Sequence, residues 1–361
     1  MTRGLLAAVL LCVSAASAAC PICLGAGQPT KAQELASAQQ AVLAVPTADA
    51  GRYRVIEVIH GDRPSSSTVE GGYPRNGPAA DPTAPKGKPL LLVRTDPFPA
   101  WMILGAIGAE QSGWLRKLAA GKRFEDMSAA DWRTRVALAL PHIESTDPLV
   151  AELAYGELAA APYAAMRTAK PRLDARPIRA WLADPQLAAR HRLYLLLLGL
   201  AGNAGDAAVL DQRVEAAWKS GDATNLASML AADLELRGAV RMPWVEEKYL
   251  RDRKRSSPEI SAALLALSVH GNANGAIPRE RVIQSYRLFM KARPEIAGYV
   301  AQDLATWQYW DAVPEYVALM KSDVPQQFPS RVATLAYLRQ SPSAEARELA
   351  LQTNALPGTR R

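Results

Sequence analysis

Cysteine and histidine are scarce in this chain, which has 3 cysteines and 4 histidines among 361 residues. Cys12 lies in an apolar N-terminal stretch, so Cys20 and Cys23 form the only cysteine pair beyond it. The histidines are scattered and have none of the spacings of a zinc or haem site. They are His60, His142, His191 and His270. The sequence therefore predicts no cofactor and no metal site built on histidine.

The signature motifs of common enzyme classes are also missing. The sequence has no G-x-S-x-G nucleophile elbow, no phosphate-binding Walker loop and no H-E-x-x-H zinc helix. Residues 25–30, GAGQPT, lack the third glycine and the preceding strand of a dinucleotide-binding fingerprint. No residue is singled out as catalytic, and we expect a non-enzymatic protein.

No apolar run is long enough to cross a membrane, which takes about 20 residues. The first run, within residues 1–19, has the pattern of a secretory signal that is cleaved before Ala19 or Cys20. The second, residues 193–202, is flanked by basic side chains and favours a buried helix. We expect an exported protein, periplasmic or secreted, without a transmembrane segment. A lipoprotein anchored through Cys20 is the alternative, although Ser17 stands where a lipobox usually has leucine.

Aromatic residues and concentrated charge are also in short supply. Aromatics make up 6% of a chain that is 49% hydrophobic, so alanine and leucine supply most of the packing surface, which suits closely packed helices. The formal net charge of +7 is spread along the chain. Its one dense basic run, residues 251–255, is interrupted by aspartate and is typical of a solvated loop. We expect no nucleic-acid partner.

Regularly spaced prolines mark helix starts in the C-terminal two thirds of the chain. They stand 37, 73 and 36 residues apart, and each precedes a large apolar residue by two positions: Pro148, Pro185, Pro258 and Pro294. Proline is tolerated in the first turn of a helix, where its missing N–H has no intrahelical partner. A further start near Asp222 divides the long interval. A period near 36 residues predicts stacked helix pairs over residues 110–355.

Residues 20–108 favour a small β domain. Strand patterns follow a short helix near residues 31–37 and occur at 41–45, 52–60, 66–71, 89–94 and 100–108. Both faces of residues 52–60 are largely apolar, so we expect that strand to be packed on both sides or to lie within a small closed barrel. Residues 72–89 are rich in proline and glycine and predict a mobile loop. Five strands joined by polar turns indicate a small antiparallel barrel.

Two resemblances extend these predictions. The helical part resembles the HEAT and armadillo type of α-solenoid in its prolines and in apolar–small pairs such as Val150-Ala151. This resemblance implies, by analogy, that a protein or peptide binds along the surface of the array. The N-terminal part resembles the netrin-type module shared with tissue inhibitors of metalloproteinases, through Cys20-Pro21-Ile22-Cys23 and the strand YRVIEVIHGD. That module implies an OB-like barrel, but this chain lacks its further cysteines, so inhibitor activity is not expected.

The sequence Cys20-Pro21-Ile22-Cys23 allows three interpretations. Two nearby cysteines in an oxidising compartment can form a structural disulfide, which is the favoured interpretation. A C-x-x-C pair with a lowered thiol pKa can also cycle between thiol and disulfide, but such pairs usually lie between a strand and a helix. Two thiolates can alternatively bind a soft metal such as Cu(I) or zinc.

Aromatic residues gather in TWQYWDAVPEY, near the end of the predicted array. The candidate binding residues there are Trp307, Tyr309 and Trp310. They could form a patch on which a ligand stacks, or they could fill the joint between two helices, which is the commoner arrangement.

The sequence as a whole predicts a mainly α protein with a small β domain. We expect a signal peptide over residues 1–19, an OB-like antiparallel barrel over 20–108 and a HEAT-like helical array over 110–355. The favoured function is that of an exported scaffold or binding protein whose array binds a protein or peptide partner. Thiol-redox or soft-metal chemistry at Cys20 and Cys23 is the alternative. Neither the partner nor the oligomeric state follows from the sequence.

Overall fold

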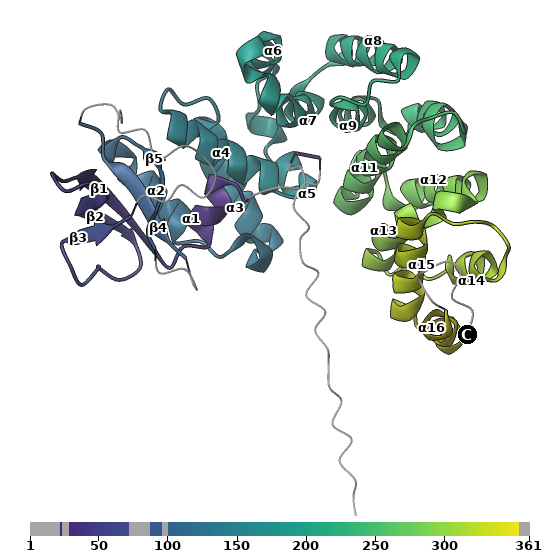
Figure 1. The fold of residues 1–361 in the computed structure, drawn as a ribbon. Helices are drawn as coiled ribbons and strands as arrows, with labels where there is room; N and C mark the ends of the chain where they lie inside the picture. The colour runs from purple at the N-terminus through teal and green to yellow at the C-terminus, as the bar shows by residue number, and fades with distance from the viewer. Residues whose placement is uncertain (1–21, 24–28, 72–86, 96–99, 354–361) are drawn as a thin grey trace, which may run out of the picture.

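The chain is mostly helical, with a curled five-stranded antiparallel sheet near its N-terminus (Figure 1). A computed structural model describes residues 22–23, 29–71, 87–95 and 100–353. The predicted signal peptide, Cys20 and residues 72–86 of the predicted loop lie outside this described part. The prediction of a mainly α protein with a small antiparallel β unit is confirmed. The domain boundary near residue 109 stays a prediction.

The sheet contains the strands that the alternating pattern predicts. Their bounds are β1 Gln40–Pro46, β2 Arg52–His60, β3 Thr68–Glu70, β4 Leu90–Arg94 and β5 Met102–Ala106. The strand order is β3-β2-β1-β4-β5, and every neighbouring pair is antiparallel. The predicted short helix, α1 Lys31–Ala36, precedes them and begins with a capping box between Thr30 and Gln33.

Shifts in strand register accompany the curl of the sheet. The β1–β2 pairing shifts after Ala41 and again after Leu43, and the β4–β5 pairing shifts after Leu91. Such bulges bend a strand and increase its twist. The two edges of the sheet meet at one point, where Gly71 forms a parallel bridge with Trp101. Because this single bridge lies outside the named strands, the sheet is a curled half-barrel, and its inner face is concave.

Both faces of the central strands carry apolar cores. Successive residues of a strand point to opposite faces. Leu43 and Leu91 join the main core beneath the helices, whereas Val42 and Leu92 join a smaller core on the concave face, together with Trp101. The four aliphatic side chains are fully buried. The central pair β1 and β4 is thus packed on both sides.

Strand β2 differs from the prediction for residues 52–60. It was expected to be packed on both sides, but most of its residues are exposed or half-buried, and Ile56 is 41% exposed. The reason is its position near the edge of the sheet, because β3 is only three residues long and pairs with Arg52, Tyr53 and Arg54 alone. Apolar side chains on both faces therefore did not identify the central strand.

The first helices of the array join the sheet to the rest of the chain. Helix α2 packs against β2, α4 against β5, and α1 against both α2 and α4. Asp147 links the two parts directly, because its carboxylate caps α4 and also accepts hydrogen bonds from Gly108 N, after β5, and Lys88 Nζ, before β4. One continuous apolar core runs from the sheet into the helices.

The helical elements follow one another at short intervals. The α-helices are α2 Ser112–Ala119, α3 Ala129–Ala139, α4 Pro148–Ala160, α5 Tyr163–Arg167, α6 Ala175–Ala183, α7 His191–Ala201, α8 Ala204–Ser220, α9 Leu226–Arg237, α10 Met242–Val245, α11 Ser257–Ala273, α12 Arg279–Ala292, α13 Ala301–Thr306, α14 Val313–Lys321, α15 Phe328–Gln340 and α16 Ala344–Gln352. The 3-10 turns are η1 Ala109–Gln111, η2 Phe124–Asp126, η3 Leu140–His142, η4 Lys170–Arg172, η5 Pro185–Arg190, η6 Gly238–Arg241 and η8 Pro294–Val300, and η7 Glu246–Arg251 is a π-helix.

These helices pack in succession along an arch that leads from the sheet to the C-terminal helices (Figure 1). Helix α7 packs on α9 and α9 on α11, while α6, α8 and α12 each pack on a member of this row. Helix α7 is buried from Leu193 to Leu200, which confirms the buried helix expected for residues 193–202. Gly199 permits its close approach to α9, because an added Cβ would lie 2.7 Å from Ala232 Cα.

The predicted helix starts are confirmed at Pro148 and, within one residue, at Pro258, where α11 begins at Ser257. At Pro185 and Pro294 the chain first forms 3-10 turns, and the α-helices begin later, at His191 and Ala301. Proline is compatible with the first turn of either kind of helix. Packing against neighbouring helices then decides where the α-helix begins.

Candidate binding groove in the helical array

A groove opens in the C-terminal half of the array, between α12, η8 and α14. Its volume is approximately 680 Å³, within the range of about 300–1,000 Å³ that is typical of ligand pockets. Residues of these three elements line it, together with Arg251 from the end of η7. The groove brings together segments that are up to some 70 positions apart in the sequence, between Arg251 and Leu319.

The end of α12 and the change of chain direction that follows it shape one wall of the groove. The residue before a proline is disfavoured in the α conformation, so Pro294 ends α12. Arg293 has the non-helical angles φ −134° and ψ 61°. The chain turns there, and Pro294 and Ala297 of η8 line the groove beside α12. The proline that predicted a helix start therefore also creates a wall of the groove.

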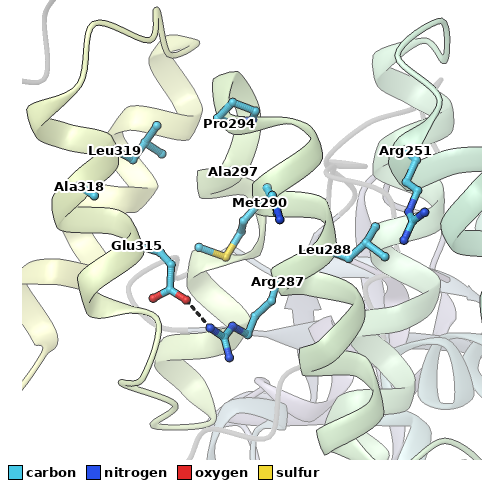
Figure 2. Close-up of a pocket in the computed structure, with 10 residues that line it drawn as sticks. Arg251, Arg287, Leu288, Met290, Pro294, Ala297, Glu315, Ala318 and Leu319 are labelled. Carbon is cyan, nitrogen blue, oxygen red and sulfur yellow. Dashed lines mark hydrogen bonds and ion pairs between the residues drawn. The ribbon is translucent and has the colours of Figure 1, made fainter.

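The centre of the groove is apolar. Figure 2 shows Met290 and Ala297 between Leu319 of α14 on one side and Leu288 of α12 on the other. Met290 and Ala297 are buried, whereas Leu288 and Leu319 are half-buried and Ala318 is exposed. The groove thus offers apolar surface that a partner's side chain could cover.

Basic side chains surround this apolar centre. Arg287 Nη2 donates a hydrogen bond to Glu315 Oε1 at 2.6 Å, and this bond raises the pKa of Arg287 above its usual value. Arg251 Nη1 lies 3.8 Å from the carboxylate oxygen Oε2 of Glu247, which is four residues earlier in η7, and both side chains are more than half exposed. Lys291 forms no ion pair within the described part of the chain. Glu315 is the one acidic residue in the lining, so the rim carries excess positive charge.

Tyr316 is the most deeply buried residue of helix α14. Tyr316 is fully buried; its hydroxyl donates to Ala297 O at 3.0 Å, and its ring centre lies 5.0 Å from that of Tyr337 in α15. It is the only fully buried residue of α14. The next turn of α14 presents Ala318 and Leu319 to the groove. Anchoring at Tyr316 and the Arg287–Glu315 pair therefore set the width of the groove.

The predicted cysteine site falls only partly within the described residues. Cys23 lies in the main core with Ile22 and is 6% exposed. Cys20 lies outside the described part. The structure therefore does not show whether the two thiols meet, and the predicted disulfide, redox or metal site stays a prediction.

The predicted aromatic patch contains partly buried rings that contact other helices. Trp307 stacks on Tyr286 with ring centres 5.5 Å apart, and its Nε1 donates to Asn272 Oδ1 at 2.7 Å. Trp310 packs instead on Tyr337, at 5.1 Å.

Tyr309, between these two tryptophans, accepts a hydrogen bond through its carbonyl oxygen from the hydroxyl of Tyr337. Trp307 and Trp310 thus fill separate joints between helices. A binding role for Trp307, Tyr309 and Trp310 stays a prediction.

Several ionisable groups are buried elsewhere in the array. Burial lowers the pKa of His270, which keeps the imidazole neutral, and its Nε2 lies 2.9 Å from Ala231 O. Burial likewise raises the pKa of Asp303, which accepts hydrogen bonds from Tyr286 and Ser268. These groups bond to their neighbours and do not line the groove. They stabilise helix contacts.

Two further searches cover the described residues. None of the helices described is both long enough and apolar enough to pass through a bilayer. Within the same residues, histidine, cysteine and acidic side chains form no group of three that could hold a metal ion. The expectations of no metal and no cofactor stay predictions.

Comparison with known proteins does not assign the chain to a family. No family model, curated protein or solved structure matches it. The site must therefore be interpreted from its own geometry.

The groove was not predicted from the sequence. Its signal was present in α12, where Leu288 and Lys291 fall on the side of the helix opposite the buried Tyr286 and Phe289. That pattern marks an exposed strip with an apolar residue in it. The position of α14 across this strip depends on contacts that no local pattern reveals.

Proposed function

We propose that this protein is an exported, non-enzymatic binding protein whose helical array binds an acidic, apolar segment of a protein partner. The observation that carries the proposal is the groove between α12 and α14, with its apolar centre and basic rim. An apolar side chain of the partner would cover Met290 and Leu319. A neighbouring carboxylate would pair with Lys291 or Arg251.

The charges of the rim favour an acidic partner over a basic one. The Arg287–Glu315 pair is 53% and 39% exposed, and pairs so exposed contribute only about 0–1 kcal/mol. A partner carboxylate can therefore compete with Glu315 for Arg287 at small cost. A basic partner segment would instead be repelled by Lys291 and Arg251. Charge complementarity of this kind raises association rates and selects between partners.

The architecture supports the same proposal by analogy. Helices that pack in succession, with a buried row through α7, α9 and α11, suit a HEAT-like array. The strand order and the parallel bridge between Gly71 and Trp101 suit an OB-like barrel. In this proposal the barrel is the N-terminal part of a scaffold, and the array supplies the binding surface.

Binding to synthetic peptides tests the groove directly. We expect fluorescence-labelled peptides that alternate leucine with glutamate to bind in anisotropy titrations, and the same peptides with lysine in place of glutamate to bind at least tenfold more weakly. Lys291→Glu should weaken binding of the acidic peptides by a similar factor, which corresponds to about 1.4 kcal/mol. Lys117→Glu is the matched control, because Lys117 is an exposed lysine on α2, away from the groove. Equal binding to Lys291→Glu and wild type would refute the proposal.

Export is tested separately by the mass of the mature protein. A mature chain that begins at Ala19 or Cys20 supports the signal peptide, and a diacylglycerol-modified Cys20 supports the lipoprotein alternative. A full-length chain retained in the cytoplasm would refute export without affecting the groove.

Thiol chemistry at Cys20 and Cys23 remains the alternative function, with less support. A thiolate must reach its substrate or metal, whereas Cys23 is 6% exposed. Alkylation of the native protein with and without reductant distinguishes the functions. Rapid labelling of Cys23 after reduction, together with turnover of a disulfide substrate that Cys23→Ser abolishes, would favour the redox function.

A further inference from the structure

A second cavity lies in the sheet, at the end of the concave face where β1 begins and β4 ends. Its volume is approximately 660 Å³, again within the range of ligand pockets. Gln40 and Arg94 are register partners across β1 and β4. Alternation along the strands places them on the same face as the buried Val42 and Leu92. The concave face is therefore apolar in its middle and polar at this end.

The cavity has an excess of positive charge. Three arginines line it, Arg52, Arg63 and Arg94, with Glu70 as the single acidic residue. Glu70 is already paired with Arg52 at 2.7 Å. Arg63 and Arg94 form no ion pair in the part of the chain that the structure describes; the guanidinium of Arg94 lies over the ring of Trp101 instead, at 5.4 Å. Two guanidinium groups are thus available to an anion.

The cavity also contains an acceptor that lacks a donor. Gln40 is 8% exposed, and its Nε2 donates to Asp62 O at 2.8 Å. A backbone carbonyl only accepts hydrogen bonds, so the amide orientation is determined and Oε1 is the remaining acceptor. Oε1 has no donor among the described residues. A buried acceptor without a donor costs about 1–3 kcal/mol, which a bound hydroxyl or N–H group would recover.

Hydroxyl groups complete the lining on the side of the β2–β3 loop. Ser66 Oγ accepts a hydrogen bond from Thr68 N at 3.2 Å and lies 3.3 Å from Thr68 Oγ1. Ser65 is exposed at the same edge. Trp101 is 6% exposed and already covered by Arg94, so its ring face is not open to stacking. Recognition here must therefore depend on charge and hydrogen bonds.

We propose that this cavity binds an acidic saccharide, in which a carboxylate pairs with Arg63 and Arg94 and a neighbouring ring hydroxyl donates to Gln40 Oε1. A simple anion without a proton, such as sulfate, would satisfy the arginines but would offer no donor to the acceptor Oε1 or to the carboxylate of Glu70. A neutral sugar would leave both guanidinium groups unpaired. A hydroxylated carboxylate satisfies both kinds of group, and this site is independent of the groove between α12 and α14.

Isothermal titration calorimetry of the full chain tests the assignment. We expect oligogalacturonate to bind with a dissociation constant in the millimolar range or below, and galactose oligomers of the same length to bind at least tenfold more weakly. Arg94→Gln and Arg63→Gln should each weaken oligogalacturonate binding at least fivefold. Arg133→Gln, which changes an exposed arginine on α3 outside the cavity, is the matched control.

The remaining outcomes also decide the proposal. Gln40→Leu should weaken binding of the oligogalacturonate and leave any binding of sulfate unchanged, because sulfate carries no proton at neutral pH that it could donate to Oε1. Equal affinity for sulfate and oligogalacturonate would show a general anion site and overturn the saccharide assignment. No binding of either, in a protein whose thermal unfolding is normal, would overturn the site altogether.

Discussion

Asp147 joins the sheet to the helical array, and replacing it tests whether the two parts stabilise each other. Its side chain is 8% exposed. Oδ1 accepts from the N–H groups of Leu149 and Val150 at the start of α4. Oδ2 accepts from Gly108 N at 3.0 Å and from Lys88 Nζ at 3.2 Å. One carboxylate therefore links a helix start to Lys88, before β4, and to Gly108, after β5.

The expected cost of Asp147→Ala is the sum of three losses. Loss of the helix cap costs about 1 kcal/mol, and leaving the buried N–H of Gly108 without an acceptor costs about 1–3 kcal/mol. The pair with Lys88 adds about 0–1 kcal/mol, because Lys88 is 43% exposed. Unfolding free energy should therefore fall by about 3 kcal/mol. Asp147→Asn should lie between wild type and Asp147→Ala, since its amide oxygen can still accept on one side, whereas its amide nitrogen only donates.

Urea denaturation, followed by tryptophan fluorescence and by far-ultraviolet circular dichroism, measures this loss. Asp174→Ala is the matched control, because Asp174 caps α6 with a side chain that is 56% exposed and has no contact with the sheet. It should lose only about 1 kcal/mol. A loss for Asp147→Ala no larger than the loss for the control would refute the argument that Asp147 connects sheet and array.

The same carboxylate gives a pH dependence with a definite sign. Burial raises the pKa of Asp147, but the hydrogen bonds from Gly108 N, Lys88 and Val150 N outweigh it and hold the pKa below its usual value. A group with a lowered folded-state pKa contributes stability above its unfolded pKa, and that contribution is lost as pH falls through the folded pKa. The difference in stability between wild type and Asp147→Asn should therefore persist at neutral pH and shrink below about pH 4.

Three other substitutions test the packing of the array. Gly199→Ala should destabilise the protein by about 1–3 kcal/mol in thermal unfolding, because the new Cβ would lie 2.7 Å from Ala232 Cα; Gly113→Ala, in open space on α2, should be neutral or slightly stabilising. Burial raises the pKa of Glu157 from 4.5 to about 7 despite its buried pair with Arg135. The unfolding free energy of wild type should therefore fall relative to that of Glu157→Gln as pH rises between those values. A rise instead would show that the attraction to Arg135 outweighs desolvation. Trp307→Ala should cost about 2 kcal/mol if the indole fills a helix joint, whereas a loss below about 0.5 kcal/mol, with ligand binding abolished, would favour the stacking patch.

Local features of the chain were predictable because they depend on neighbouring residues. Alternating apolar residues identified the strands, and the capping box of Ser128 and Asp131, with its characteristic spacing of three residues, marks the start of α3. Even here tertiary contacts changed details. The start expected near Asp222 is at Leu226, after a turn in which Asp222 accepts from Thr224 N, and α11 is capped by Ser256. Which residue becomes the N-cap of a helix depends on how the preceding segment packs.

Amino-acid sequence by itself determined that this protein is mostly helical, with a small sheet near its N-terminus, because periodicity and capping act over a few residues. Tertiary structure alone decided that Asp147 bonds to Gly108, that Arg94 lies beside Gln40, and that α12 and α14 line one groove. Each of these contacts joins segments whose separation along the chain leaves no local signal. Both proposed sites arise at such contacts, which is why the sequence indicated the architecture and not the positions of the sites.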